Sequence, residues 1–188
     1  ARLAESTGRD GWERYADTLA ERATSIFDTK ITATLFVRLG RVAETRLTDL
    51  PRAAEAFARA AEQGGDSDEV LTALERIHAA TGNTRALVDV LERRIVITED
   101  KAAQADLLVR LATLQISELG DKMQGLGTLR LALEKVPEHE PSRAMVETLL
   151  GDDATFEEAF DTLEGVYRAT SRGADLGRLY ARKVDRAP

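Results

Sequence analysis

The chain contains two histidines and no cysteine, so few of its side chains could ligate a metal or act in acid-base catalysis. His78 lies in LERIHAATG at a position where helical spacing calls for a large apolar residue, and we expect it to pack. His139 lies in the turn VPEHEP, where we expect it to be exposed to solvent. Neither histidine has a second or third ligand at metal-binding spacing. The sequence therefore predicts no metal site and no histidine-based catalytic site.

Carboxylates gather in residues 66–69 (DSDE) and 151–153 (GDD). A calcium loop would need alternating oxygen ligands over 12 residues with Gly at the sixth position, and neither stretch keeps that register. Helix caps and a solvated surface explain both stretches. Phosphate-cradling and nucleophile-elbow motifs are also absent from the sequence. We expect no catalytic residues and no cofactor, and hence no enzymatic activity.

Arginine outnumbers lysine 21 to 5, as is typical of a GC-rich bacterial genome. Arg38 and Arg110 lie in matching contexts 72 residues apart, which makes a repeated guanidinium position. Guanidinium groups in a row could hold acidic side chains through paired hydrogen bonds. The alternative is ordinary surface ion pairing, for example between Arg41 and Glu44.

The elements that would position these residues read as short helices. Apolar residues recur at three- and four-residue spacing in residues 35–47 and again in residues 53–61. Asp49 can cap a helix that has Pro51 in its first turn, and Gly64-Gly65 can end it. No segment alternates apolar and polar residues for long, so the predicted fold class is all-α.

A long stretch of the chain repeats without a gap. Residues 35–62 align with residues 107–134, an offset of 107 − 35 = 72. A second pattern, LERIHAATG (74–82), recurs as LEGVYRATS (163–171) at an offset of 89. The 17 additional residues fall within 142–158 and predict an extra helix at about Pro141–Leu150. Repetition at such periods is typical of solenoids, whose helical hairpins bury their apolar faces against neighbouring hairpins.

The repeated residues resemble the tetratricopeptide repeat family, which pairs two helices over about 34 residues. The matches cover nearly the whole chain, in three sets: Phe36, Leu39, Gly40, Ala53, Phe57 and Ala60; Leu74, His78, Gly82, Leu87 and Leu91; Leu108, Leu111, Ala112, Gly125, Leu129, Ala132 and Pro137. The family's Tyr position holds Ala43 and Gln115, and one residue is inserted between the helices of the better hairpins. Gly125 and Gly127 fall inside a predicted helix, at a cost of about 1 kcal/mol each.

The resemblance implies a right-handed α-α superhelix of antiparallel hairpins that binds a peptide or a partner helix on its concave face. Groove-facing positions would then be Val37, Arg41 and Glu44, then Thr72 and Arg76, then Val109, Thr113 and Ile116. With the repeated arginines, the predicted protein-binding residues are Val37, Arg38, Arg41, Arg76, Val109 and Arg110. The carboxylate clamp of chaperone-binding members is not supported, because Val37 and Arg41 stand where Lys and Asn are expected.

The expected organisation is one solenoid over residues 1–188, with units of about 1–30, 34–98 and 104–186. Because its first residues, ARLAESTG, read as the interior of a helix, we expect it to be a segment of a larger repeat protein. The net charge of −7 disfavours nucleic acid, and no apolar run is long enough to insert into a membrane. The absence of a signal segment favours the cytoplasm over secretion.

We therefore expect a non-enzymatic scaffold whose partner is another protein. Two alternatives stay open. One is a structural segment that stacks on further repeats or on a second copy of itself, which makes a homo-oligomer. The other is a helical enzyme, or an accessory subunit, whose catalytic residues lie outside this segment.

Overall fold

The computed structural model describes residues 8–186, so most of ARLAESTG lies outside the described part. Throughout residues 8–186 every regular element is helical and no strand occurs, which confirms the all-α class. The elements are α2 (Gly8–Ser25), α3 (Thr29–Val42), the π-helix η1 (Ala43–Leu47), α4 (Leu50–Gly64), α5 (Asp68–Thr81), α6 (Thr84–Ile97), α7 (Lys101–Ser117), α8 (Lys122–Lys135), α9 (Glu140–Leu149), α10 (Phe156–Ala169) and α11 (Gly173–Asp185). None of these helices is long and apolar enough to cross a membrane.

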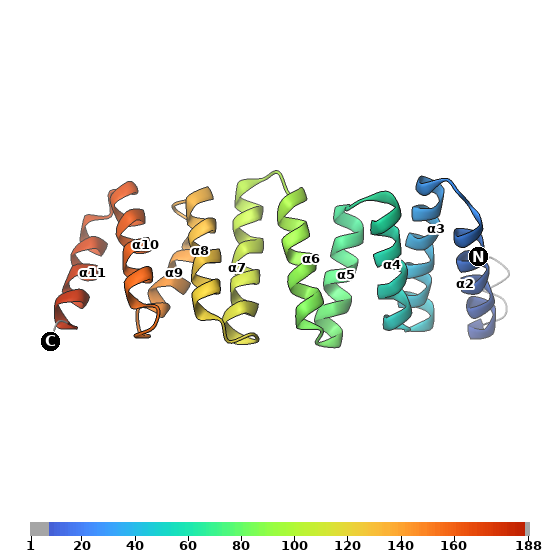
Figure 1. Ribbon diagram of the computed structural model, residues 1–188, viewed down its shortest axis with the longest axis horizontal. Coiled ribbons are helices and arrows are strands. Elements are labelled where there is room, and N and C mark those ends of the chain that lie inside the picture. Colours follow the sequence, from blue (N-terminus) through green and yellow to red (C-terminus); the bar gives the residue numbers. More distant parts are fainter. Residues whose placement is uncertain (1–7, 187–188) are drawn as a thin grey trace. The chain divides into compact units, whose positions relative to one another are not determined.

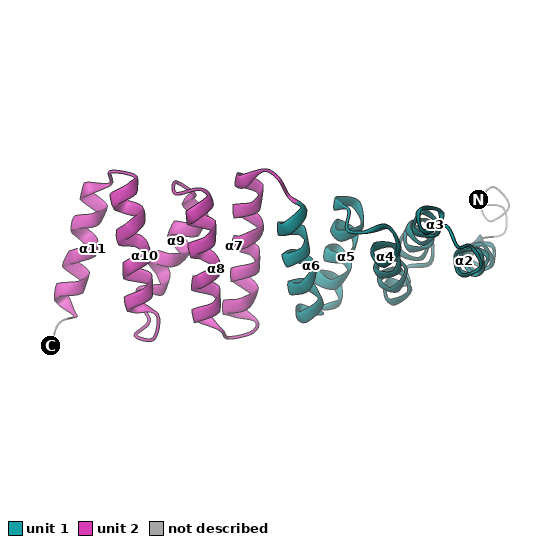
Figure 2. Cartoon of the chain, turned by 45° about the horizontal axis from the view of Figure 1, so that its top comes forward, with its two compact units in different colours: residues 1–97 teal, residues 98–188 magenta. Residues whose placement is uncertain are grey.

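The chain divides into two compact units, residues 1–97 and residues 98–188 (Figure 2). Unit 1 contains α2 to α6, and unit 2 contains α7 to α11. Within each unit successive helices run antiparallel and pack on their neighbours (Figure 1). The packing of α3 on α4 and of α7 on α8 is the most extensive, and these are the two hairpins that the 72-residue repeat predicts.

The turns inside these two hairpins have the same geometry. Thr48 and Gly120, 72 residues apart, are both left-handed, with φ of 56° and 71°. The residues that follow, Asp49 and Asp121, cap α4 and α8, each accepting a hydrogen bond from the backbone three residues on. The repeat therefore extends to the conformation of single residues.

The extra residue between the helices is accommodated by a widened helical turn. In unit 1 this turn is the π-helix η1, and the Asp49 N–H donates to the Ala43 carbonyl at 2.8 Å. In unit 2 the Asp121 N–H makes the equivalent bond to the Gln115 carbonyl, also at 2.8 Å. A π-turn takes up one residue without ending the helix.

The pattern repeated at 89 residues also folds the same way twice. Gly82 and Ser171 end α5 and α10 in the left-handed conformation, with φ of 65° and 57°. In both copies the next N–H donates to a carbonyl five residues back: Asn83 to His78 at 3.0 Å, and Arg172 to Tyr167 at 2.8 Å. The extra residues before the second copy form the predicted additional helix, α9.

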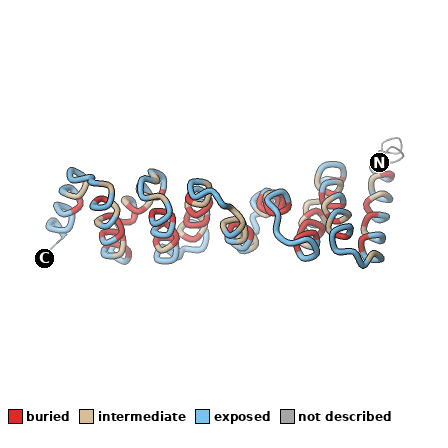
Figure 3. The backbone as a smooth tube through the Cα atoms, turned by 90° about the horizontal axis from the view of Figure 1, so that it is seen from above, coloured by how far each residue is buried: buried red, intermediate tan, exposed pale blue. Residues whose placement is uncertain are grey.

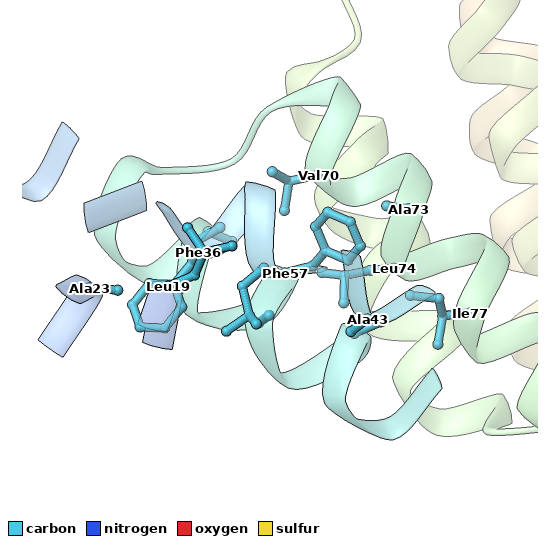
Figure 4. Close-up of a cluster of buried hydrophobic side chains, with 14 of the residues drawn as sticks. Leu19, Ala23, Phe36, Ala43, Phe57, Val70, Ala73, Leu74 and Ile77 are labelled. Atoms are coloured by element: carbon cyan, nitrogen blue, oxygen red, sulfur yellow. The ribbon is translucent and has the colours of Figure 1, made fainter. Parts of the chain in front are cut away.

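Each unit has its own apolar core (Figure 3). In unit 1 the Phe57 ring is buried among side chains of α3 and α5, near Leu74 and Ile77 (Figure 4). Gly40 makes this packing possible, because a Cβ at that position would lie 2.8 Å from the Phe57 ring. In unit 2 the corresponding core includes Leu126, Leu129 and Leu163.

Candidate functional site

A solvent-open hollow of about 310 Å³ lies in unit 1 between α3 with η1 on one side and α5 on the other. We call it the α3–α5 hollow. Its lining includes Arg41, Glu44, Phe57, Glu69, Thr72 and Arg76. The floor is apolar, since Phe57 reaches it from α4, whereas the walls are charged.

Two ion pairs cross the α3–α5 hollow. Arg41, in the last turn of α3, pairs with Glu69 in the first turn of α5. Arg76 on α5 donates from Nε and from Nη2 to the two carboxylate oxygens of Glu44, both at 2.7 Å. The hydrogen bond to Glu44 raises the pKa of Arg76 above its ordinary value. These arginines do form surface ion pairs, the alternative given above, but the partner named there for Arg41 is wrong: Arg41 pairs with Glu69 and Glu44 with Arg76, across the hollow and not along one helix.

The crossed pairs set the electrostatics of the hollow. Asp68 also lines it, so two arginines face three carboxylates. Asp68 in turn accepts a hydrogen bond from Arg94 of α6 at 2.8 Å. Both arginines of the hollow are thus already matched by carboxylates, and a ligand's acidic group would have to displace Glu44 or Glu69.

The other predicted binding residues lie outside this hollow. Arg38 is exposed on α3, and Val37 packs partly buried against the core of unit 1. Val109 and Arg110 belong to α7 in unit 2, where Val109 packs against the core and Arg110 is exposed. Of the six predicted residues, the structure brings only Arg41 and Arg76 together.

The two histidines have different surroundings. His78 is half-buried on α5, and burial lowers its pKa, which fits the packing role expected for it. The expectation that His139 is exposed is wrong, because its side chain is only 11% exposed. Its Nδ1 lies 2.8 Å from Ser142 Oγ, and its Nε2 lies 3.1 Å from Asp106 Oδ1.

This Ser-His-Asp cluster links helices, and its serine is enclosed although Asp106 is 71% exposed. Ser142 is completely buried in the first turn of α9, so no acyl group could reach its hydroxyl. Asp106 comes from α7, and His139 precedes α9, so the cluster ties α7 to α9. The spacing of Ser142 three residues after His139 is visible in the sequence, but Asp106 could be found only from the fold. No group of three His, Asp or Glu residues within 8–186 is placed to hold a metal ion.

The similarity of this chain to known proteins lies in its structure and not in its sequence. No family model matches the sequence, and no curated protein matches it. Among solved structures the chain is similar to YrrB, described as a TPR protein with an unusual peptide-binding site. The two chains are 18% identical, the alignment covers 91% of this chain and 86% of that chain, and the TM-score is 0.48.

Proposed function

We propose that the chain is a non-enzymatic scaffold that holds a segment of a partner protein in the α3–α5 hollow. The observation that carries the proposal is the pair of crossed ion pairs around an apolar floor. Arg41 and Glu69 are both largely exposed, so their pair can be exchanged at little cost, whereas Glu44 of the other pair is only 15% exposed and must keep a cationic partner. Phe57 below them is only 1% exposed, so a ligand between the charged walls would rest on a packed apolar floor.

The charge pattern indicates what such a segment would carry. A purely acidic segment would meet three carboxylates, and a purely basic one would meet two arginines. A segment with both an acidic and a basic side chain can replace both internal pairs while every charge stays matched. Complementary charges of this kind increase the specificity and the association rate of binding more than they increase its affinity.

The test is affinity capture of proteins from the source cells by the wild-type chain and by charge-reversed variants. The hollow variant is Arg41→Glu with Arg76→Glu. The matched control is Arg9→Glu with Arg85→Glu, which makes the same charge change at two exposed arginines of unit 1 outside the hollow. We expect partners that are captured by the wild type and the control and lost with the hollow variant. Capture of one and the same set by all three proteins would contradict the proposal.

Self-association is a second candidate, favoured by exposed apolar side chains. Phe27, in the turn between α2 and α3, is fully exposed, and Val184 near the end of α11 is 72% exposed. Such residues are buried when repeats stack on a second copy. Light scattering over a range of concentrations tests this candidate: a constant monomer mass contradicts it.

A further inference from the structure

Unit 2 contains a second hollow, of about 320 Å³, between α8 and α10. We call it the α8–α10 groove. Leu133 and Pro137 line it from one side, and Gly165, Val166 and Ala169 line it from α10. In contrast to the α3–α5 hollow, its lining is mainly apolar.

The groove exists because α10 carries small residues where it faces α8. Gly165 has no side chain, and a Cβ built there has no described atom within 4 Å. Ala169, one turn further on, is exposed. Leu133 is only 2% exposed, so an occupant that entered the groove would rest on a well-packed floor.

The 89-residue repeat places this groove on the same helical face as the α3–α5 hollow. Thr72 and Arg76 of α5 line the hollow, and their counterparts Asp161 and Gly165 of α10 line the groove (161 − 72 = 89; 165 − 76 = 89). The charged side chain of Arg76 in the α3–α5 hollow is thus replaced by open space at Gly165 in the α8–α10 groove. The same face of α5 and α10 therefore offers different chemistry, and the opposite wall differs too, because the hollow has α3 there and the groove has α8, the counterpart of α4.

The rim of the groove is acidic. Arg130 on α8 is shared between Glu134, at 3.8 Å, and Glu158. Asp161 on the opposite rim forms no ion pair with any described residue. Lys183 of α11 adds a second cation near Asp161, but it pairs with Glu157. The carboxylates therefore stay in excess, which favours a ligand with positive charges beside its apolar residues.

The dimensions favour a helix as the occupant. The lining runs from Arg130 on α8 to Pro137 just after it, and from Asp161 to Ala169 on α10, about two helical turns or roughly 12 Å on each side. Up to Ala132 on α8 and Arg168 on α10 the backbone groups are bonded within their own helices or end turns, so an extended peptide would find few main-chain partners there. A helical ligand needs no main-chain partners, because its own backbone groups are bonded internally, and its apolar face can lie in a groove between two helices.

We propose that the α8–α10 groove is a docking site for an amphipathic helix of a partner protein, with an apolar stripe flanked by Lys or Arg. The apolar stripe contacts Leu133, Val166 and the exposed backbone at Gly165. The flanking cations face Asp161 and Glu134. This site is separate from the α3–α5 hollow and does not depend on its function.

The test is selection of binders from a displayed random-peptide library with the full chain, followed by affinity measurement on Gly165→Leu. The leucine fills the groove, and because a Cβ at this position meets nothing, the variant is expected to fold with unchanged helicity. Gly177→Leu is the matched control, since Gly177 is an exposed helical glycine of α11 with an equally open Cβ position outside the groove. A second variant, Glu134→Lys with Asp161→Lys, reverses the rim charge.

We expect selected peptides to be basic and amphipathic with helical spacing. Their affinity should fall at least about tenfold in Gly165→Leu and in the rim variant, and should be unchanged in Gly177→Leu. Peptides that bind Gly165→Leu as well as the wild type would overturn the proposal, as would enrichment of acidic peptides. A selection that yields no binder would overturn it too.

Discussion

At the scale of single residues, the clearest result is that arginines of unit 1 pair across helices. Arg41, Arg76 and Arg94 each find a carboxylate on another element. Sequence spacing can suggest only pairs within one helix, three or four residues apart. Which carboxylate lies across a helix interface depends on the packing of both helices, so these pairs could not be predicted from the sequence.

The buried pair of Glu75 with Arg94 provides a stability prediction. Glu75 is 5% exposed on α5 and bonds to Arg94 of α6. Glu75→Gln removes the buried one of the two carboxylates that bind Arg94, while the exposed Asp68 stays in place, and we expect a loss of about 1.5 to 3 kcal/mol in the free energy of unfolding. Glu55→Gln is the matched control, because its pair with Arg59 is exposed and 3.7 Å long, and its cost should stay below about 0.5 kcal/mol. Urea denaturation measures both, and equal losses would contradict the assignment.

His78 provides a pH prediction. Its pKa lies below the ordinary 6.5 mainly because of burial, although Asp89 opposes the shift. Just below pH 6.5 the unfolded chain therefore binds a proton that the folded chain does not, so stability falls as the pH drops through this window. His78→Tyr, which copies the buried counterpart Tyr167, should remove this loss.

The measurement is the urea midpoint of His78→Tyr and of the wild type at about pH 7.5 and about pH 5.5, above the range where most carboxylates titrate. The difference in slope between the two proteins is the contribution of His78. An unchanged slope would show that His78 is not protonated differently in the folded and unfolded chains.

At the scale of helices and turns, the sequence was a good guide wherever the cause is local. Asp49 caps α4 and Gly82 ends α5, as their residue types predict. Thr48 and Ser171 take the left-handed conformation without being glycine, and only their alignment with Gly120 and Gly82 could have indicated it. The π-turn of η1 was visible as one inserted residue, but its form depends on the packing of α3 against α4.

Gly125 and Gly127 of α8 look alike in the sequence and differ in the structure. A Cβ at Gly127 meets no described atom within 4 Å, whereas one at Gly125 would collide with the Ile116 side chain and lie 3.2 Å from the Ala112 carbonyl oxygen. Gly127→Ala should therefore raise the free energy of unfolding by about 1 kcal/mol. Gly125→Ala should lower the free energy of unfolding. Overpacking costs about 1 to 3 kcal/mol, and the better helix propensity of alanine offsets part of that cost. Thermal unfolding compares the two, and a shift of the same sign in both would contradict this account.

At the scale of the whole molecule, each of the two compact units has its own core. Whether the units unfold separately or as the single solenoid expected from the sequence can therefore be tested. Phe57→Ala and Leu163→Ala each remove a fully buried side chain, one from each core, at a cost of about 3 to 5 kcal/mol. We expect each variant to accelerate amide hydrogen exchange in its own unit only. Faster exchange throughout the chain in both variants would instead indicate one cooperative solenoid.

The surroundings of Trp12 have a practical consequence. It is the only tryptophan of the sequence, it stands edge-on to Tyr15, and the Arg46 guanidinium covers its ring at 4.9 Å. All three residues belong to unit 1. The indole fluorescence of the chain therefore reports on unit 1. A single label in unit 2 is then enough to follow the unfolding of both units in one experiment.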